Sequence, residues 1–289
     1  MHYEGNVIRP PSEADSILLQ VTVGCSHNAC AFCGAYLGER FRLKDLDVVF
    51  ADIEFAARTM PRARRLFLLS GDAMIAPQSC LTAVLERVRE RLPRVARVGT
   101  YANVKSLRGK SGEDLAALQS LGLSLVYMGL ESGDDDLLRA MGKEADLADM
   151  LAQAAKVQAA GMKLSVTVIN GLAGVAGSTA HALATGRALS LMQPDQAAFL
   201  SLIPVPGTPL WHDMRAGRFE LPDARGMLGE LRLMLEHTHV ARGLFLANHA
   251  SNYLPLKLRL PKDKQAGLAL LDAALAGEKT LVPERLRRL

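Results

Sequence analysis

Three cysteines lie close together near the start of the chain, at Cys25, Cys30 and Cys33. Thiolates are the ligands that zinc, copper(I) and iron–sulfur clusters prefer. The chain has only four cysteines, so the grouping of three of them argues against a disulfide framework. The spacing therefore predicts a metal site with Cys25, Cys30 and Cys33 as its ligands.

Three thiolates are one ligand short of a closed site. A structural zinc site takes four protein ligands, whereas a catalytic zinc keeps one position open. A [4Fe–4S] cluster held by three thiolates likewise leaves one iron free for a small molecule. Cys80 or His27 as a fourth ligand would restore a structural site, although a free cysteine is more often a small buried hydrophobe. A redox pair of Cys30 and Cys33 is a further alternative, but it leaves Cys25 without a role.

The elements that position these cysteines follow from the hydrophobic pattern. Short apolar runs alternate with longer segments of helical spacing, which is typical of repeated βα units and a parallel sheet. Strands are predicted at residues 17–23, 66–70, 95–101, 124–131, 163–169 and 196–203. Helix N-caps are expected at Asp45, Ser79, Asp146 and Ser178, and helix-ending glycines at Gly122 and Gly161.

Six βα units predict an α/β fold, either an open doubly wound sheet or a partial barrel, because parallel neighbours need right-handed helical crossovers. Both architectures place chemistry at the carboxyl ends of the strands. The cysteine loop directly follows the first predicted strand, so we expect it at that edge. Beyond Pro209 the pattern changes, and we expect residues 211–289 to be a C-terminal extension that packs on a barrel formed by residues 1–210.

Composition narrows the setting of the protein. A formal charge of +4 over 289 residues does not by itself indicate nucleic acid. The first apolar run, residues 17–23, is too short for a signal sequence or a membrane span. We therefore expect a cytoplasmic protein without a membrane partner, in a reducing compartment that suits exposed thiolates.

The cysteine loop, which ends Cys30-Ala31-Phe32-Cys33, and the six βα units behind it resemble the radical S-adenosylmethionine (SAM) enzymes. This resemblance implies a partial (β/α)6 TIM-like barrel over about the first 210 residues. It implies a [4Fe–4S] cluster on Cys25, Cys30 and Cys33, with S-adenosyl-L-methionine bound to the fourth iron. It also implies reductive cleavage of SAM, a 5′-deoxyadenosyl radical that takes hydrogen from a small-molecule substrate, and an electron donor such as flavodoxin or ferredoxin.

The same resemblance assigns residues to SAM. Gly71 and Asp72 occupy the place of the family's Gly-Gly-Glu segment, whose backbone receives the SAM amino group. Glu131, at a strand end, is expected to bond ribose or methionine groups, and Ile169 lies in a segment similar to the family's adenine-binding strand. The remaining expected contacts are Phe32 and Tyr36 beside the adenine, Asn103 at the ribose or at the start of a turn, and Arg139 and Lys143 at the SAM carboxylate or as exposed helix charges.

Two departures and one further segment bear on the function. Four residues separate Cys25 from Cys30, where the family usually has three, and aspartate stands at position 72. The polar segment 248–253 offers His249 and Asn252 as candidate catalytic residues, with His249 suited to proton transfer. A haem-binding chaperone related to coproporphyrinogen oxidases, with haem on His249, and a zinc-site barrel hydrolase are the alternative functions.

Overall fold

The computed structural model describes residues 1–288, and the chain forms two compact units. The first unit comprises Met1–Asn28, Ala35–Met128 and Ala152–Leu164, and the second comprises Ala29–Gly34, Gly129–Leu151 and Ser165–Leu289. The first unit thus includes Cys25, and the second includes Cys30 and Cys33. The boundary expected after residue 210 stays a prediction.

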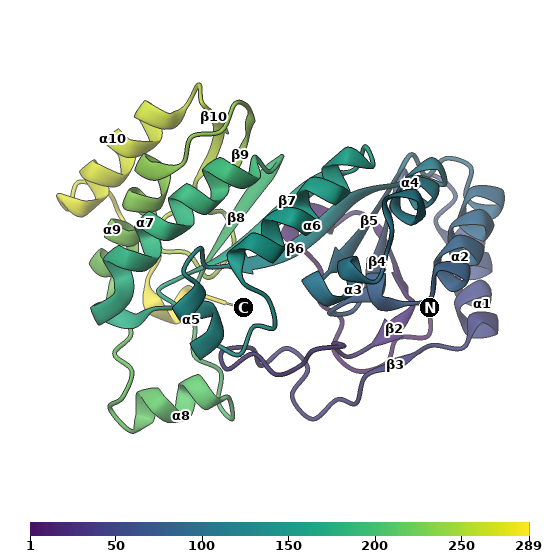
Figure 1. Cartoon of the computed structure of the whole chain (residues 1–289), viewed down its shortest axis with the longest axis horizontal. Coiled ribbons are helices and arrows are strands. Elements are labelled where there is room, and N and C mark those ends of the chain that lie inside the picture. Colours follow the sequence, from purple (N-terminus) through teal and green to yellow (C-terminus); the bar gives the residue numbers. More distant parts are fainter. Residues whose placement is uncertain (289) are drawn as a thin grey trace. The chain divides into compact units, whose positions relative to one another are not determined.

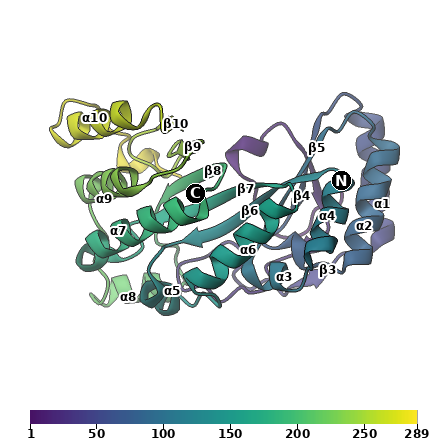
Figure 2. The same cartoon turned by 45° about the horizontal axis from the view of Figure 1, so that its top comes forward.

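In the first unit, parallel strands alternate with helices. The strands are β1 (Ile17–Gln20), β4 (Arg65–Leu69), β5 (Arg97–Ala102) and the first part of β6 (Leu123–Glu131), paired in that order. The helices are α1 (Leu46–Thr59), α2 (Gln78–Arg91), α3 (Val104–Arg108), α4 (Gly112–Ser120) and the end of α6 (Leu147–Ala159), with short turns of 3-10 helix at Pro11–Glu13 and Ala73–Ile75. Figure 2 shows α1 beside α2.

The antiparallel strands β2 (Thr22–Val23) and β3 (Arg42–Leu43) lie on either side of the cysteine loop in the sequence.

Aromatic side chains form part of the core of this unit. Phe67 packs edge-on against Tyr101 and Tyr127, with ring centroids 5.0 and 5.5 Å away. Leu69 and Leu125 complete this cluster. Because these residues come from β4, β5 and β6, the cluster fixes the strands whose ends carry Gly71 and Asn103.

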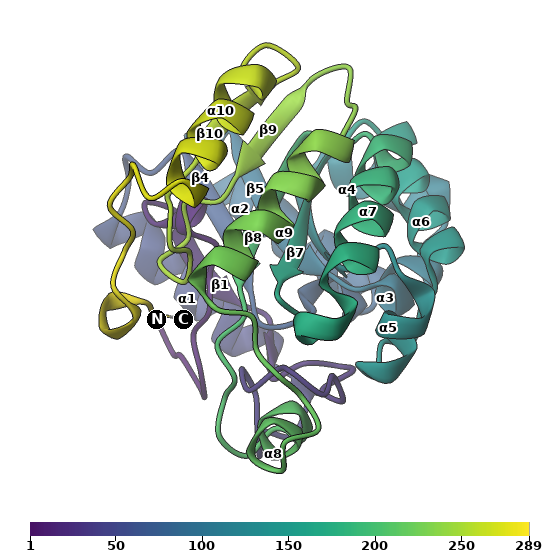
Figure 3. The same ribbon diagram turned by 90° about the vertical axis from the view of Figure 1, so that its left-hand side faces the viewer.

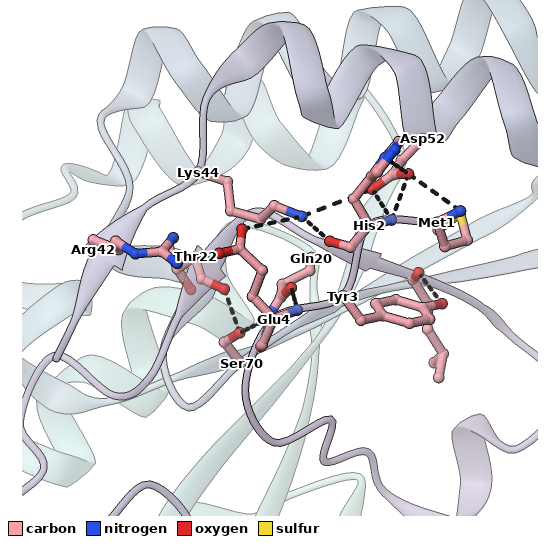
Figure 4. Close-up of polar contacts among 11 residues, drawn as sticks. Met1, His2, Tyr3, Glu4, Gln20, Thr22, Arg42, Lys44, Asp52 and Ser70 are labelled. Carbon is pink, nitrogen blue, oxygen red and sulfur yellow. Dashed lines mark hydrogen bonds and ion pairs between the residues drawn. The ribbon is translucent and has the colours of Figure 1, made fainter. Parts of the chain in front are cut away.

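A buried polar cluster holds the first residues of the chain against α1 (Figure 4). The backbone N–H of His2 donates to both carboxylate oxygens of Asp52, at 2.8 and 3.0 Å. Asp52 is fully buried, and the ammonium group of Lys44 lies 3.8 Å from it. A buried carboxylate needs such partners, because desolvation would otherwise oppose its charge.

In the second unit, β7 (Lys163–Asn170, from Ser165 on), β8 (Gln196–Ser201) and β9 (Gly243–Leu246) are parallel, and β10 (Lys257–Leu260) runs antiparallel to β9. Its helices are α5 (Asp135–Ala140), the start of α6, α7 (Gly174–Met192), α8 (Pro209–Arg215), α9 (Ala224–His237) and α10 (Lys264–Leu275), with a 3-10 turn at Glu284–Leu286. Helix α9 packs against both α7 and α10 (Figures 1 and 3). The segment beyond residue 210 therefore extends the barrel strands with β9 and β10, and Phe245 of β9 stacks on Phe199 of β8.

The strand order of the chain is β1-β4-β5-β6-β7-β8-β9-β10, which confirms the predicted α/β class with a mostly parallel sheet. All six predicted strands are present, and the first is divided into β1 and β2. The strands β9 and β10 were not predicted, because four-residue runs carry too little periodicity to stand out. Over residues 1–288, none of the helices combines the length and the apolar character needed to cross a bilayer.

The predicted helix ends are confirmed in part. Asp45 caps α1, since its side chain accepts from the backbone N–H of Asp47 at 2.8 Å. Asp146 accepts from the N–H of Asp149 at 2.9 Å, and Gly122 and Gly161 have positive φ angles of 102° and 80°. The two serine caps are wrong. Helix α2 begins at Gln78, ahead of Ser79, and α7 begins at Gly174, so that Ser178 lies inside it.

Candidate cofactor site

The first cysteine meets the end of β4 within the first unit. The backbone N–H of Gly71 donates to the carbonyl of Gly24, at 3.1 Å. A Cβ atom at position 71 would lie 2.7 Å from Cys25 Cβ and 3.1 Å from its Sγ. Real Cβ atoms do not approach that closely, so only glycine allows this contact. Tyr36 is buried and its ring would lie 2.8 Å from the same Cβ, which places it beside Gly71.

A hydrogen-bonded cluster of Ser26, Asp72 and Asn103 stands next to this contact. The Ser26 hydroxyl donates to Asp72 Oδ2 at 2.6 Å and accepts from Asn103 Nδ2 at 3.0 Å. The backbone N–H of Asn103 donates to Asp72 Oδ1 at 3.2 Å. Asp72 is fully buried, and burial raises its pKa to about 6 against the opposing effect of these hydrogen bonds. Ser26 is the first of the four residues between Cys25 and Cys30, so the cluster ties down the start of the longer loop.

Asn103 also begins a helix. Its side-chain oxygen accepts from the N–H of Ser106 at 2.8 Å and caps α3. Its side-chain nitrogen remains directed to Ser26. The expected start of a turn is therefore present, and a contact with ribose stays a prediction.

Ser70, directly before Gly71, has a left-handed backbone with φ of 86°. Such a conformation is costly for a residue other than glycine, by about 1 kcal/mol or more. Its hydroxyl donates to the carbonyl of Thr22 and lies 3.4 Å from Gln20 Nε2. Gln20 in turn exchanges hydrogen bonds with the backbone of Glu4, at 2.8 and 2.9 Å (Figure 4). These contacts hold the strained turn that presents Gly71.

The other two cysteines lie in the second unit. The N–H of Cys33 donates to the carbonyl of Cys30 at 3.1 Å, which closes a turn between them. Ala31, the first of the two residues between them, pairs its N–H with the carbonyl of Met141 and its carbonyl with the N–H of Leu210, both at 2.9 Å. Backbone bonds on both sides thus fix this part of the loop. Cys30 and Cys33 are partly exposed and are not in a disulfide.

Two expected adenine contacts share an apolar cluster in the second unit. Phe32 and Ile169, both partly buried, pack against a core that includes Leu172, Leu202 and Tyr253. The cluster joins the cysteine turn to the ends of β7 and β8. It offers the kind of apolar surface on which a planar base packs.

The two candidate cations differ in their surroundings. Lys143 is mostly buried, and its ammonium group lies 3.3 Å from Glu131 Oε1 and 3.2 Å from the carbonyl of Gly129. Glu131 ends β6 with a left-handed φ of 62°. Arg139 is instead an exposed charge on α5, and its guanidinium pairs with Asp136 at 2.6 Å. Of the two, only Lys143 stands beside the expected site residue Glu131.

The two candidate catalytic residues, Asn252 and His249, differ in their hydrogen bonds and burial. Asn252 is buried, its Oδ1 accepts from Ser201 Oγ at 2.9 Å and its Nδ2 donates to the carbonyl of Phe199 at 2.7 Å. Both bonds fasten the 248–253 loop to β8, which gives Asn252 a structural role. His249 is half-buried, and burial lowers its pKa. Its Nδ1 accepts from the N–H of Ser251 at 3.1 Å, so the neutral ring carries its proton on Nε2.

Sequence reasoning missed three polar residues, which are Ser26 in the first unit and His181 and Glu230 in the second. Ser26 had a signal, because it is the first residue of the unusual cysteine gap. Glu230 had a weaker one, since it follows Met227 by three residues and precedes Met234 by four, a spacing that puts it on the apolar side of a helix. His181 lies within the small-residue helix α7, which shows no comparable pattern.

The thiols fit a soft metal centre in their chemistry. Cys25, Cys30 and Cys33 are partly exposed and not in disulfides, and Gly71 leaves room beside Cys25 that a larger side chain would fill. Cys80 differs, because it lies on α2 and burial raises the pKa of its thiol. Within residues 1–288, no three His, Cys, Asp or Glu side chains are already gathered around a single ion position. The assignment of the three thiols to one cluster stays a prediction.

Several solved structures share this fold. Methylornithine synthase matches with a TM-score of 0.55 and 17% identity, over 78% of this chain and 63% of that one. Coproporphyrinogen III oxidase from Escherichia coli, described as a radical SAM enzyme, matches with a TM-score of 0.58 and 16% identity, over 76% and 51%. A radical SAM methyltransferase from Kitasatospora setae matches with a TM-score of 0.55 and 18% identity, over 67% and 35%. The chain thus spans less than two thirds of the length of each, and at these identities the likeness shows the fold, a partial barrel of the radical SAM type.

The sequence itself gives the family. A comparison with curated protein sequences finds no match. Residues 19–184, more than half of the chain, match the radical SAM superfamily. That range includes the three cysteines, Gly71, Asp72, Asn103, Glu131 and Ile169. The chain therefore belongs to the radical SAM superfamily, and this membership implies a [4Fe–4S] cluster and SAM as its cofactors.

Proposed function

We propose that this protein is a radical SAM enzyme that acts on a small-molecule substrate. When bound, a [4Fe–4S] cluster would supply the electron for reductive cleavage of SAM, and the 5′-deoxyadenosyl radical that this chemistry provides would take hydrogen from the substrate. The observation that carries the proposal is the approach of Gly71 to Cys25, beside the buried carboxylate of Asp72. It sets a cysteine and a polar strand end at one place, within the part of the chain that matches the family.

The residues of the chain would bind and orient the cofactors. Cys25, Cys30 and Cys33 would hold the cluster as thiolates. Gly71 and the neighbouring Asp72 would receive the SAM amino group, since Asp72 keeps its side chain fixed by Ser26 and by the backbone of Asn103.

Recognition of the rest of SAM would fall mainly to the second unit. The ion pair of Lys143 and Glu131 offers both a cation for the SAM carboxylate and an acceptor for hydroxyl groups. Phe32 and Ile169 supply apolar surface for the adenine. Arg139 is not included among the residues that bind the SAM carboxylate, because an exposed arginine that already pairs with Asp136 would gain little from a second anion.

Catalysis of this kind needs a supply of electrons and protection from water. An electron donor such as flavodoxin or ferredoxin would deliver the electrons. His249, neutral and half-buried in the segment 248–253, is the candidate for moving a proton at Nε2. The apolar cluster around Leu202 and Tyr253 would keep water from the reacting atoms.

The test is an anaerobic assay of the reconstituted protein with SAM and a chemical reductant. We expect the wild type to form 5′-deoxyadenosine and methionine, measured by chromatography, and the Cys30→Ala variant to form neither. A Cys80→Ala variant is the matched control and should behave as the wild type. Haem binding without SAM cleavage would favour the chaperone alternative, and zinc in place of iron would favour the hydrolase.

A further inference from the structure

Helix α9 lies outside the part of the chain that matches the family, yet it contacts the end of β7 directly. The N–H of Gly171 donates to Glu230 Oε1 at 2.5 Å. The side-chain nitrogen of Asn170 donates to the carbonyl of Met227 at 2.9 Å. A Cβ atom at position 171 would lie 2.6 Å from Met227 Sδ. Two hydrogen bonds and one close contact thus join residues 170 and 171 to α9.

The carboxylate of Glu230 is held on its other side as well. Ser178, on α7, donates its hydroxyl to Glu230 Oε2 at 2.5 Å. Helices α7 and α9 lie side by side along this contact (Figures 1 and 3). Glu230 is only 2% exposed, and burial raises its pKa to about 7. A buried carboxyl group with both oxygens in use is a rigid point of attachment.

A second buried residue, His181, supports the same segment from α7. Its Nε2 lies 3.1 Å from the carbonyl of Ile169 and 3.6 Å from Glu230 Oε1, and its Nδ1 lies 2.8 Å from Ser132 Oγ. Burial lowers the pKa of His181 to about 4, so the ring is neutral at pH 7 and donates from Nε2 to the Ile169 carbonyl. The backbone of residues 169–171 is therefore held from both helices.

We propose that Glu230 is a positioning residue that fixes the backbone of residues 169–171 in the conformation that receives the adenine of SAM. This inference rests on the proposed function, because it takes Ile169 as part of the adenine site. Glu230 is fully packed away behind Gly171, so it acts through the backbone and does not touch the cofactor. Helix α9 would thus be part of the support of the SAM site, although it follows the family-matching region.

The experiment measures binding without turnover, on the full chain carrying its reconstituted cluster and with no reductant. Equilibrium dialysis gives the affinities for SAM and for free methionine, which lacks the adenine. Glu230→Ala should weaken SAM binding about tenfold, as expected for the loss of about one buried hydrogen-bonded group. Methionine binding and iron content should stay unchanged. Glu230→Gln keeps an acceptor for Gly171 and should restore SAM affinity to near the wild-type value.

The matched control is Glu236→Ala on the same helix. Glu236 is partly exposed and pairs with Arg232 at 2.8 Å, so its loss should leave SAM affinity unchanged. Hydrogen–deuterium exchange of the peptide covering residues 165–175 should rise in Glu230→Ala and not in the control. Unchanged SAM affinity in a folded Glu230→Ala, or an equal loss for SAM and methionine, would overturn the inference.

Two further outcomes are decided by the same set of measurements. If Glu230→Ala does not fold, Ser178→Ala takes its place, with an expected loss of about threefold in SAM affinity because one of the two bonds to Glu230 is gone. An unchanged affinity in Ser178→Ala then overturns the inference. If the reconstituted wild type itself binds no SAM, the proposed function fails first, and the inference fails with it.

Discussion

The chain carries two buried carboxyl groups at strand ends, and they differ in what surrounds them. Asp72, after β4, bonds to Ser26 and Asn103, which are both partly exposed. Glu230, behind the end of β7, bonds to the backbone of Gly171 and to Ser178. Burial raises both pKa values, to about 6 for Asp72 and to about 7 for Glu230. One cluster borders the cysteine loop, whereas the other joins the end of β7 to α7 and α9.

The two carboxyl groups are therefore expected to act differently: Asp72 at the binding surface and Glu230 through the backbone. Asp72 directly follows Gly71 and bonds to Ser26, the residue after Cys25, so the Asp72 cluster belongs to the candidate binding surface. Glu230 reaches a ligand only through the backbone of residues 169–171. Changes at Asp72 should therefore affect cluster and SAM together, while changes at Glu230 should affect SAM alone.

The largest contrast is expected between the two glycines beside these carboxyl groups. Gly71→Ala places a methyl group against Cys25 Cβ and the ring of Tyr36, atoms that cannot move without shifting the cysteine. It should lose most of the cluster iron. Gly171→Ala meets the flexible end of Met227 and adds left-handed strain of about 1 kcal/mol. It should keep its iron. Iron and sulfide analysis checks this, and equal iron content in the two variants would contradict it.

Removal of the Asp72 carboxyl group should have the next largest effect. Asp72→Ala leaves the Ser26 hydroxyl without its acceptor, at a cost of about 1–3 kcal/mol, while the Asn103 N–H keeps Ser106 Oγ. We expect SAM affinity to fall about tenfold or more, together with faster loss of iron to a chelator. Asp72→Asn keeps an acceptor and should lie between this variant and the wild type. If Asp72→Ala lost only SAM affinity and kept its iron as firmly as the wild type, the distinction between the two clusters would be wrong.

The two cations near the end of β6 should differ by a smaller amount. Lys143→Ala removes a mostly buried ammonium group beside Glu131, and SAM affinity should fall by about tenfold through loss of a charge-assisted hydrogen bond. Arg139→Ala removes an exposed charge whose partner is Asp136, and SAM affinity should change by less than about twofold. The comparison is made by measuring the dissociation constant for SAM of each variant at the same ionic strength. A greater loss in Arg139→Ala would reverse this assignment.

The net pH dependence of stability should be small in the wild type, because two buried groups titrate with opposite effects. Burial raises the pKa of Glu230 from 4.5 to about 7. Folding therefore takes up a proton between these pH values, and the free energy of unfolding falls as the pH rises through them. Burial lowers the pKa of His181 from 6.5 to about 4. Folding therefore releases a proton in this range, and the free energy of unfolding falls as the pH drops through it. The two opposing trends should partly cancel in the wild type.

Glu230→Gln isolates the first of these trends. Relative to the wild type it should gain stability as pH rises from about 4.5 to 7, by up to about 3 kcal/mol, and no more above that. Denaturant unfolding at pH 5 and pH 8 measures the gain. A difference between the two proteins that does not change with pH would show that Glu230 is not held protonated by burial.

The sequence was enough to predict the strands that carry the site but not how their ends are held. Apolar runs and end glycines predicted all six strands, because burial of both sheet faces leaves a strong pattern. The roles of Ser26 and Glu230 depend on residues 46 and 59 positions away in the chain, Asp72 and Gly171. Nothing local encodes such pairs. Ser178 shows the same limit, since its hydroxyl fits an N-cap in sequence and instead bonds to Glu230 from within α7.

The most direct test of the account is the electron paramagnetic resonance spectrum of the reduced protein, with and without SAM. The account predicts about four iron and four sulfide per chain after anaerobic reconstitution, and a cluster signal that changes when SAM is added. At a SAM concentration that saturates the wild type, the change should be weakened or lost in Asp72→Ala and kept in Glu230→Gln. A cluster signal that SAM leaves unaltered, or a protein that takes up zinc in place of iron, would contradict the assignment of Cys25, Cys30 and Cys33 to a cluster that binds SAM.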